Sequence, residues 1–183
     1  MKKTLIILTA GLLTFNINAE PYTASVSGFI GKKSVDDSAW KPFEEQLELG
    51  VVLDFKPASW PVSIVAGLYG SSDAKNYDKD NETHGFTSEF ILGLRQTWSI
   101  RGTNLHPYYG MGVAFIEGEI QDSIDTQKDS AIGYWVGTGI NWTIAQHFDV
   151  GIEGRYSQAE IEFSDGNVEA GGTHLGLTLG YNW

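Results

Sequence analysis

The end of the chain, Thr173–Trp183, alternates between two kinds of residue. From His174 onward, the even-numbered positions are polar or glycine, and the odd-numbered positions are Leu175, Leu177, Leu179, Tyr181 and Trp183. Because successive side chains of a β-strand point to opposite faces, this pattern predicts a strand with one continuous apolar face. Such a face has to be covered either by a protein core or by lipid.

The same alternation recurs in seven earlier segments. The segment 44–56 shows it best, because alternate positions from Leu47 to Phe55 are all apolar, whereas Val52 is the only apolar residue on its other face. We therefore expect eight strands, the last of which is 173–183. The other seven are predicted at about 22–32, 44–56, 62–71, 84–99, 106–119, 130–143 and 147–161.

The predicted connections alternate in length. Those after the second, fourth and sixth strands have about three to seven residues, and one of them contains Pro57 and Pro61, which cannot continue a ladder. Those after the first, third, fifth and seventh strands have about ten to fifteen residues and are rich in Asp, Glu, Lys, Ser and Asn. This arrangement predicts an all-β fold, an eight-stranded antiparallel up-and-down transmembrane β-barrel with its long loops outside and its short turns in the periplasm.

Alternation alone does not say which face of the sheet lines the inside of this barrel. A soluble barrel of the lipocalin type also alternates, but its apolar face points inward. Here the polar face is rich in glycine, which a narrow eight-stranded lumen requires, and it carries charges of both signs. We predict a network of lumen ion pairs in which Arg155 pairs with Glu48 or Glu89, and Arg95 with Asp54, Asp149 or Glu153.

Aromatic residues of the apolar face gather near the predicted short turns. A ring of aromatic side chains at each edge of an aliphatic band is typical of a surface that faces a bilayer. We predict that the girdle at the short-turn end consists of Tyr22, Phe55, Trp98, Tyr109, Trp142, Phe148, Tyr181 and Trp183.

The segment from Asp165 to Trp183 resembles the small outer-membrane β-barrels of Gram-negative bacteria, of the OmpA and OmpX type. The resemblance covers the predicted barrel at the level of architecture and does not imply one activity. It implies residence in the outer membrane and recognition of the last strand by the barrel-assembly machinery. Leu179, Tyr181 and Trp183 would form that assembly signal.

The first nineteen residues have the features of a secretory signal peptide. Lys2 and Lys3 precede an apolar run that ends near Phe15, and Ala19 is a suitable residue before the cut. The run is shorter than the roughly 20 residues of a membrane-spanning helix. We therefore expect a signal peptide over 1–19 and a barrel domain over 20–183.

Composition excludes some functions. Without Lys2 and Lys3 the chain keeps ten basic and 23 acidic residues, a formal charge of −13, so nucleic-acid binding is not expected. The absence of cysteine excludes disulfides. The acidic segment Asp73–Glu82 lacks the spacing of a calcium loop, and no metal or cofactor is expected.

Three functions stay open. The first is a structural or surface-interaction role, in adhesion or envelope integrity, in which the loops contact lipopolysaccharide or an extracellular ligand; Trp40, Pro42 and Phe43 are apolar residues of one loop. The second is an enzyme that modifies lipid A or phospholipid. His84 and Ser88 are placed near the outer leaflet, but residues four apart on a strand are separated by about 13 Å. The third is a narrow pore. We expect a monomer with no catalytic residues.

Overall fold

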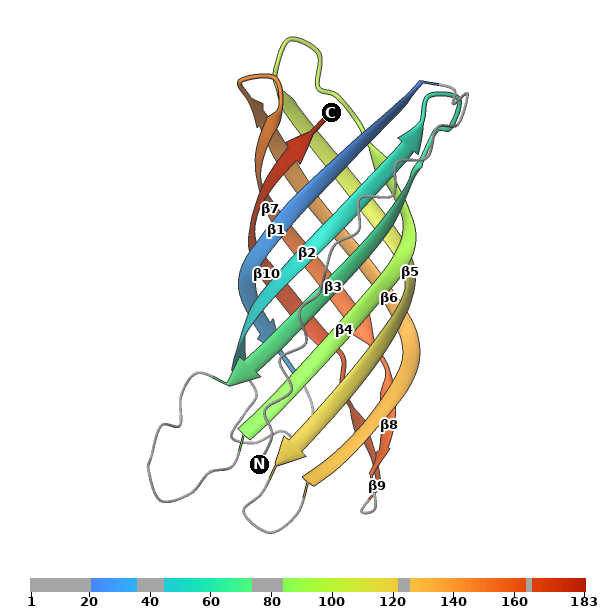
Figure 1. Ribbon diagram of the computed structural model, residues 1–183, viewed down its shortest axis with the longest axis vertical. Coiled ribbons are helices and arrows are strands. Elements are labelled where there is room, and N and C mark those ends of the chain that lie inside the picture. Colours follow the sequence, from blue (N-terminus) through green and yellow to red (C-terminus); the bar gives the residue numbers. More distant parts are fainter. Residues whose placement is uncertain (1–20, 36–44, 74–83, 122–125, 164–165) are drawn as a thin grey trace, which may run out of the picture.

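The computed structural model describes residues 21–35, 45–73, 84–121, 126–163 and 166–183 (Figure 1). The predicted signal peptide and the loop residues Trp40, Pro42 and Phe43 lie outside these ranges. The strands are β1 (Tyr22–Ser34), β2 (Glu45–Pro57), β3 (Ser63–Asp73), β4 (His84–Thr97), β5 (Leu105–Gln121), β6 (Thr126–Ile144), β7 (Phe148–Gln158), β8 (Glu160–Phe163), β9 (Gly166–Glu169) and β10 (Gly172–Asn182). The described part holds no helix long and apolar enough to cross a membrane.

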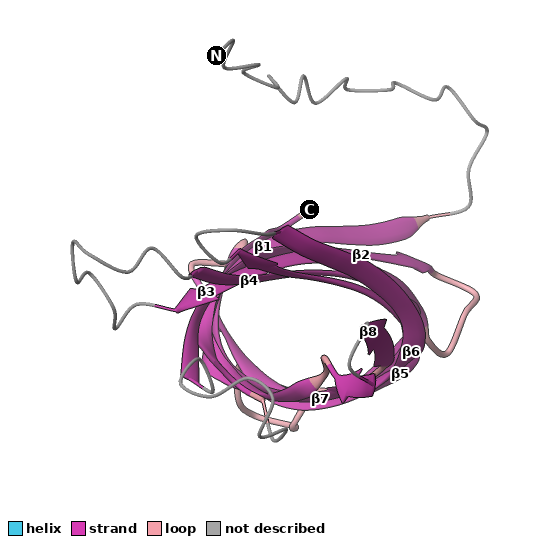
Figure 2. Cartoon of the chain, turned by 90° about the horizontal axis from the view of Figure 1, so that it is seen from below, coloured by secondary structure: helices cyan, strands magenta, loops and turns pink. Residues whose placement is uncertain are grey.

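Eight of these strands form one closed antiparallel barrel. Its order is β1-β10-β7-β6-β5-β4-β3-β2, and the end-on view in Figure 2 shows the closed ring. The first and last strands join over ten pairs, from Ser25 opposite Asn182 to Ser34 opposite Thr173. Closure leaves this sheet without an open edge, so each of the eight barrel strands has two hydrogen-bonded neighbours. The predicted fold class, an eight-stranded up-and-down barrel, is confirmed.

The tight turn between β6 and β7 adopts an unusual backbone conformation. Ala145 and Gln146 have φ angles of 51° and 71°, in the left-handed region that residues other than glycine rarely adopt. The turn between β4 and β5 places a glycine, Gly102, at φ 80°. Turns of this hand match the twist of the strands that they join, which explains why the chain accepts them here.

The end of the seventh strand differs from the prediction. The seventh strand ends at Gln158 instead of continuing to about 161, and a separate hairpin, β8–β9, follows it. Ala159 and Ala170 are buried where the chain leaves and re-enters the barrel, and the amide of Ala170 donates to the carbonyl of Ala159 at 2.9 Å. In Figure 2, β8 lies inside the outline of the ring.

The connection after the fifth strand is shorter than predicted. Strands β5 and β6 continue to pair as far as Gln121 opposite Thr126, so only 122–125 lie between them. Polar residues such as Glu117 and Lys128 resemble a loop in composition, yet they continue an existing ladder. Once two neighbouring strands are paired in register, backbone hydrogen bonds can extend the ladder, and the added residues need no apolar face.

The outer surface of the barrel is apolar. Leu175, Leu177 and Leu179 of β10 keep 56–64% of their surface exposed, and aliphatic residues of the other seven barrel strands are exposed in the same way. In a water-soluble protein such residues would be buried, because each contributes about 1.5–3 kcal/mol on burial. The exposed band therefore matches a surface that faces hydrocarbon.

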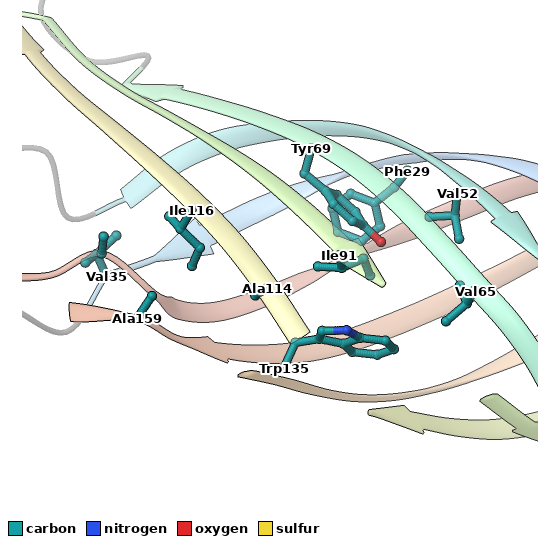
Figure 3. Close-up of a cluster of buried hydrophobic side chains, with 11 residues drawn as sticks. Phe29, Val35, Val52, Val65, Tyr69, Ile91, Ala114, Ile116, Trp135 and Ala159 are labelled. Carbon is teal, nitrogen blue, oxygen red and sulfur yellow. The ribbon is translucent and has the colours of Figure 1, made fainter. Parts of the chain in front are cut away.

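The lumen contains an apolar cluster as well as charges. Phe29, Val52, Tyr69, Ile91 and Trp135 point inward and are each at most 4% exposed (Figure 3). The rings of Phe29 and Tyr69 meet edge to face, with centroids 5.6 Å apart. The alternation of the sequence already puts Val52 and Trp135 on this face, but an apolar cluster within the lumen was not predicted from it.

Candidate functional site

Charged side chains from facing strands meet in the lumen on the side of the long loops. Arg155 of β7 lies 3.1 Å from Glu48 of β2 and 3.9 Å from Glu89 of β4, measured from guanidinium nitrogen to carboxylate oxygen. All three side chains are at most 2% exposed. We call this group, together with Lys33, Ser157 and His174, the loop-side cluster.

His174 links two of the acids of the loop-side cluster. Its Nδ1 lies 2.9 Å from both carboxylate oxygens of Glu48, and its Nε2 lies 3.0 Å from the hydroxyl of Ser157. The Ser157 hydroxyl donates to Glu89 at 3.1 Å. Strand β10 places His174 on the inner face because it has the parity of Gly176 and Thr178, as the alternation requires.

Lys33 completes the loop-side cluster and was not among the predicted lumen charges. Its ammonium group donates to the Thr87 hydroxyl at 3.2 Å and to the Ala170 carbonyl at 2.9 Å, and its side chain is fully buried. The predicted first strand ended at position 32, whereas β1 continues to Ser34. Had the strand been extended by one residue, the inward parity of Phe29 would have assigned Lys33 to the lumen.

Besides His174, the loop-side cluster holds two cations, Lys33 and Arg155, and two anions, Glu48 and Glu89. The charges of these four groups balance, which is what allows ionised groups to stay buried without bulk water. Lone charges in such a place would cost several kcal/mol each. Every described member depends on its partners for burial.

A second group, the turn-side cluster, lies nearer the short turns. Arg95 is 3.6 Å from Asp54 and 3.4 Å from Glu153. Glu153 also accepts hydrogen bonds from the hydroxyls of Tyr108, at 2.7 Å, and Tyr69, at 3.3 Å. The Arg95 guanidinium stands 4.3 Å from the centre of the Tyr108 ring, so one tyrosine contacts both partners of the ion pair.

The two clusters are joined through Tyr69. Its hydroxyl contacts Glu153 of the turn-side cluster, while its ring lies 3.4 Å below the guanidinium carbon of Arg155 in the loop-side cluster. Tyr69 also packs against Phe29 in the apolar cluster. Polar and apolar contacts thus share one side chain across the middle of the lumen.

Six of the seven predicted lumen charges take part in these ion pairs, and the seventh does not. The carboxylate of Asp149 accepts hydrogen bonds from the Thr143 hydroxyl at 2.6 Å and the Asn182 amide at 2.9 Å. Its place near the short turns, on the rim of the lumen, puts it beside neutral partners instead of Arg95. Strand parity alone does not give this height along the barrel.

One trio in the lumen has the donor types of a metal site. Glu48, Glu89 and His174 each offer a ligand atom, and these atoms lie within 4.8 Å of one another. However, Arg155 Nη2 lies 3.0 Å from His174 Nδ1 and 3.1 Å from Glu48, so a guanidinium already occupies the position between the donors. A divalent cation there would face two further positive charges, and the residues do not fit one.

Ser157, His174 and Glu48 also have the connectivity of a serine–histidine–acid triad. The hydroxyl of Ser157 is fully buried, however, and it donates to Glu89 as well as contacting His174. A nucleophile needs a reachable carbonyl carbon about 3 Å away, and the buried position of Ser157 gives none access. His84 and Ser88, considered above for an outer-leaflet lipid, are four residues apart on β4, opposite Gln121 and Glu117 of β5.

The lumen widens into a polar cavity at the short-turn end. The cavity has a volume of about 480 Å³ and is lined by small polar residues such as Ser25, Thr97 and Asn141, with Asp54 and Arg95 among its charged residues. The clusters described above lie between this cavity and the loop side of the barrel.

The eight aromatic residues of the predicted girdle lie on the outer surface, each at least 41% exposed. Several contact each other across strands: Tyr22 with Phe55 at 5.3 Å, Trp98 with Tyr109 at 5.3 Å, and Phe148 with Tyr181 at 5.4 Å between ring centres. The pairs sit beside the turns that join β2 to β3, β4 to β5 and β6 to β7.

Comparison with solved structures agrees with this geometry. The chain has the fold of the small outer-membrane β-barrels. The outer-membrane protein OprG of Pseudomonas aeruginosa matches with a TM-score of 0.64 at 12% identity, over 90% of this chain and 97% of that one. Ail, the attachment invasion locus protein of Yersinia pestis, matches with a TM-score of 0.61 at 12% identity, over 90% and 99%.

The N-terminal β-barrel domain of Pseudomonas aeruginosa OprF matches with a TM-score of 0.58 at 14% identity, over 88% of this chain and 97% of that domain. No protein-family model and no curated protein matches the chain. The resemblance to small eight-stranded outer-membrane barrels is thus confirmed at the level of the fold, while identities this low carry no function from one barrel to another.

Proposed function

We propose that this protein is an integral outer-membrane β-barrel with a closed lumen and a structural or surface-interaction role in the cell envelope. The observation that carries the proposal is that the apolar face of the sheet is outside the barrel and the charged face inside, which is the reverse of a water-soluble barrel. Leucine, valine and isoleucine cover the outside, whereas two lysine- or arginine-centred clusters are buried inside. Only a hydrocarbon environment makes both placements favourable.

Export and assembly follow from the same proposal. A signal peptide over residues 1–19 would deliver the chain to the periplasm, and the barrel-assembly machinery would bind the last strand through Leu179, Tyr181 and Trp183. Leu179 and Tyr181 project from one face of β10, Trp183 directly follows the strand, and the three side chains are 41–64% exposed, so a partner can reach them. The aromatic girdle would then rest at the periplasmic interface of the membrane.

A closed lumen is the second element of the proposal. It is supported by the loop-side cluster and by the buried side chains of Phe29, Tyr69 and Trp135, which lie in the lumen on the path that an ion would have to take. Purified protein in a planar bilayer should show no stable single-channel steps. Regular steps at neutral pH would favour the narrow pore instead.

The surface role is supported by charge. The acidic loops would contact lipopolysaccharide through bridging divalent cations, or an extracellular ligand, and the barrel would act as a monomer. A deletion strain tests this: detergent sensitivity or adhesion should change, while the lipid A structure, determined by mass spectrometry, should not. A change in lipid A structure that is reversed when the wild-type gene is returned would favour the alternative function, an enzyme that modifies lipid A.

A further inference from the structure

The lipid-facing surface is not uniformly convex. A groove of about 510 Å³ crosses β5, β6, β7 and β10, and its lining is almost wholly apolar. The outward side chains that line it are Tyr109, Met111, Val136, Thr138, Tyr156, Thr173 and Leu175. The groove thus extends from the aromatic girdle of the short-turn end, at Tyr109, toward the loop side, at Tyr156.

Small residues create the hollow. Thr138 and Gly154 are opposite each other on β6 and β7, and Leu175 is opposite Gly154 on β10. A Cβ atom built on Gly154 would have only the Leu175 Cδ1 atom near it, at 4.0 Å. The neighbouring outward positions on the same strands, Val136 and Ile152, carry branched aliphatic side chains, so the floor is lower than its surroundings.

Thr138, beside Gly154 at the floor, does not make the groove polar. Thr138 Oγ1 donates to the carbonyl oxygen of Tyr108 at 2.8 Å. Its hydrogen-bonding capacity is therefore used by the backbone, and its methyl group is left for packing. Because the lining is almost wholly apolar, the groove favours an apolar ligand over sugars and charged solutes.

We propose that this groove binds one acyl chain of a bilayer lipid in a fixed position. The inference rests on the proposed placement in a membrane, because the groove is continuous with the apolar band on both sides. An acyl chain in the hollow contacts protein along several sides, whereas one on a flat wall contacts it along one, and these dispersion contacts favour the groove over bulk lipid. A second copy of the chain would present the same concave patch, and two hollows cannot fill each other.

The test fills the groove and compares it with a matched position. Gly154→Phe places a ring in the hollow, whereas Gly28→Phe places one on β1, outside the groove, where the nearest atom to a built Cβ is the Leu179 carbonyl oxygen at 3.9 Å. Both variants are extracted from membranes in mild detergent and their bound lipid is counted by native mass spectrometry. Wild-type protein and Gly28→Phe should each retain one lipid, and Gly154→Phe should retain about tenfold less. Equal retention by all three would overturn the proposal.

A second measurement uses unmodified protein, in case Gly154→Phe fails to fold. A phospholipid with a photoreactive diazirine in its acyl chain is incorporated into vesicles with the barrel, and the adducts are mapped by peptide. Adducts should concentrate on β6 and β7 relative to β1. An even distribution around the barrel would contradict a fixed chain, although it would still show lipid contact; adducts nowhere on the barrel would instead contradict membrane insertion itself.

A second copy as the occupant would give a separate result. The chain contains no cysteine, so Gly154→Cys provides a single reactive thiol. Efficient disulfide dimers of this variant in membranes, and none with Gly28→Cys, would overturn the acyl-chain proposal in favour of a dimer interface.

Discussion

Arg155 Nη2 lies 3.1 Å from Glu48 Oε1, and the two residues come from β7 and β2, which are not neighbours in the barrel. Strands β1 and β10 separate them around the wall, so this ion pair crosses the lumen. Among the described residues, the Nε and Nη1 atoms of Arg155 have no hydrogen-bond partner, although Nη1 lies 3.9 Å from Glu89. The arginine therefore holds Glu48 by a hydrogen bond as well as by charge, and Glu89 by charge alone.

Replacing this arginine should strongly destabilise the barrel. Arg155→Met leaves Glu48 and Glu89 buried with Lys33 as their remaining cation, and breaking a buried pair in this way costs about 3–5 kcal/mol. We expect a corresponding decrease in the free energy of unfolding, measured by urea titration of the barrel in phospholipid vesicles. The double variant Arg155→Met with Glu48→Gln should recover part of the loss.

The exposed pair Lys32–Glu45 is the control for this experiment. Its atoms are 3.9 Å apart and its side chains are 74% and 53% exposed. Lys32→Met should change the free energy of unfolding by less than about 1 kcal/mol. An equal loss in Lys32→Met and Arg155→Met would mean that burial in the lumen adds nothing to the pair.

Tyr108 and Tyr109 are adjacent residues of the same type on opposite faces of β5. Tyr108 donates to Glu153 at 2.7 Å inside the lumen, whereas Tyr109 faces outward and is 46% exposed. Tyr108→Phe leaves a buried carboxylate with one donor fewer, so the free energy of unfolding should fall by about 1–3 kcal/mol. Tyr109→Phe should cost about 0.5 kcal/mol or less. Comparable losses would show that the Tyr108 hydroxyl has no role in holding Glu153.

Gly50 is required because the ring of Tyr69 covers it. A Cβ atom at position 50 would lie 2.3 Å from Tyr69 Cδ1, closer than atoms can approach. Gly50→Ala should displace the ring and lower the free energy of unfolding by about 1–3 kcal/mol. Gly28→Ala, in open space on the outer face, should be neutral or slightly stabilising. If both alanine variants unfold at the same urea concentration, the packing of Tyr69 over β2 is wrong.

The turn between β6 and β7 offers a gain in stability. Gln146 has a φ of 71°, which disfavours a residue with a Cβ atom but not glycine. Gln146→Gly should raise the free energy of unfolding by about 0.5–1 kcal/mol, since relief of strain exceeds the added entropy of the unfolded chain. Asn104→Gly, in the turn before β5 and without a positive φ, should not stabilise the barrel. A loss of stability with Gln146→Gly would contradict the left-handed conformation.

The architecture was predictable because alternation is a local property. In β2 and β10 the position of a residue along the strand gives the face on which its side chain lies, and this assignment needs no knowledge of distant contacts. Arg155, Glu48 and Glu89 could be placed together for a related reason: parity puts them in the lumen, and the up-and-down order gives their approximate heights. The eight-stranded lumen is narrow enough that inward charges at one height must meet.

Other features depend on details that alternation does not encode. Lys33 lies one residue beyond the predicted end of its strand, and its partner Ala170 is in the bend between β9 and β10. The β8–β9 hairpin depends on the close approach of Ala159 and Ala170, two residues without a distinctive pattern. The inward aromatics Phe29, Tyr69 and Trp135 fill the space that facing glycines such as Gly50 leave, and that match appears only when strands are in register.

The central claim, that the apolar face of the barrel lies against acyl chains, is tested most directly at β10. Leu177→Cys is labelled with bimane, reconstituted in vesicles, and exposed to phospholipids brominated in the middle of their acyl chains; Asn104→Cys, in an exposed turn, is the control. The account predicts strong quenching of the label at position 177 and little at position 104. An unquenched label at position 177, on protein recovered as a soluble monomer from the periplasm, would contradict it.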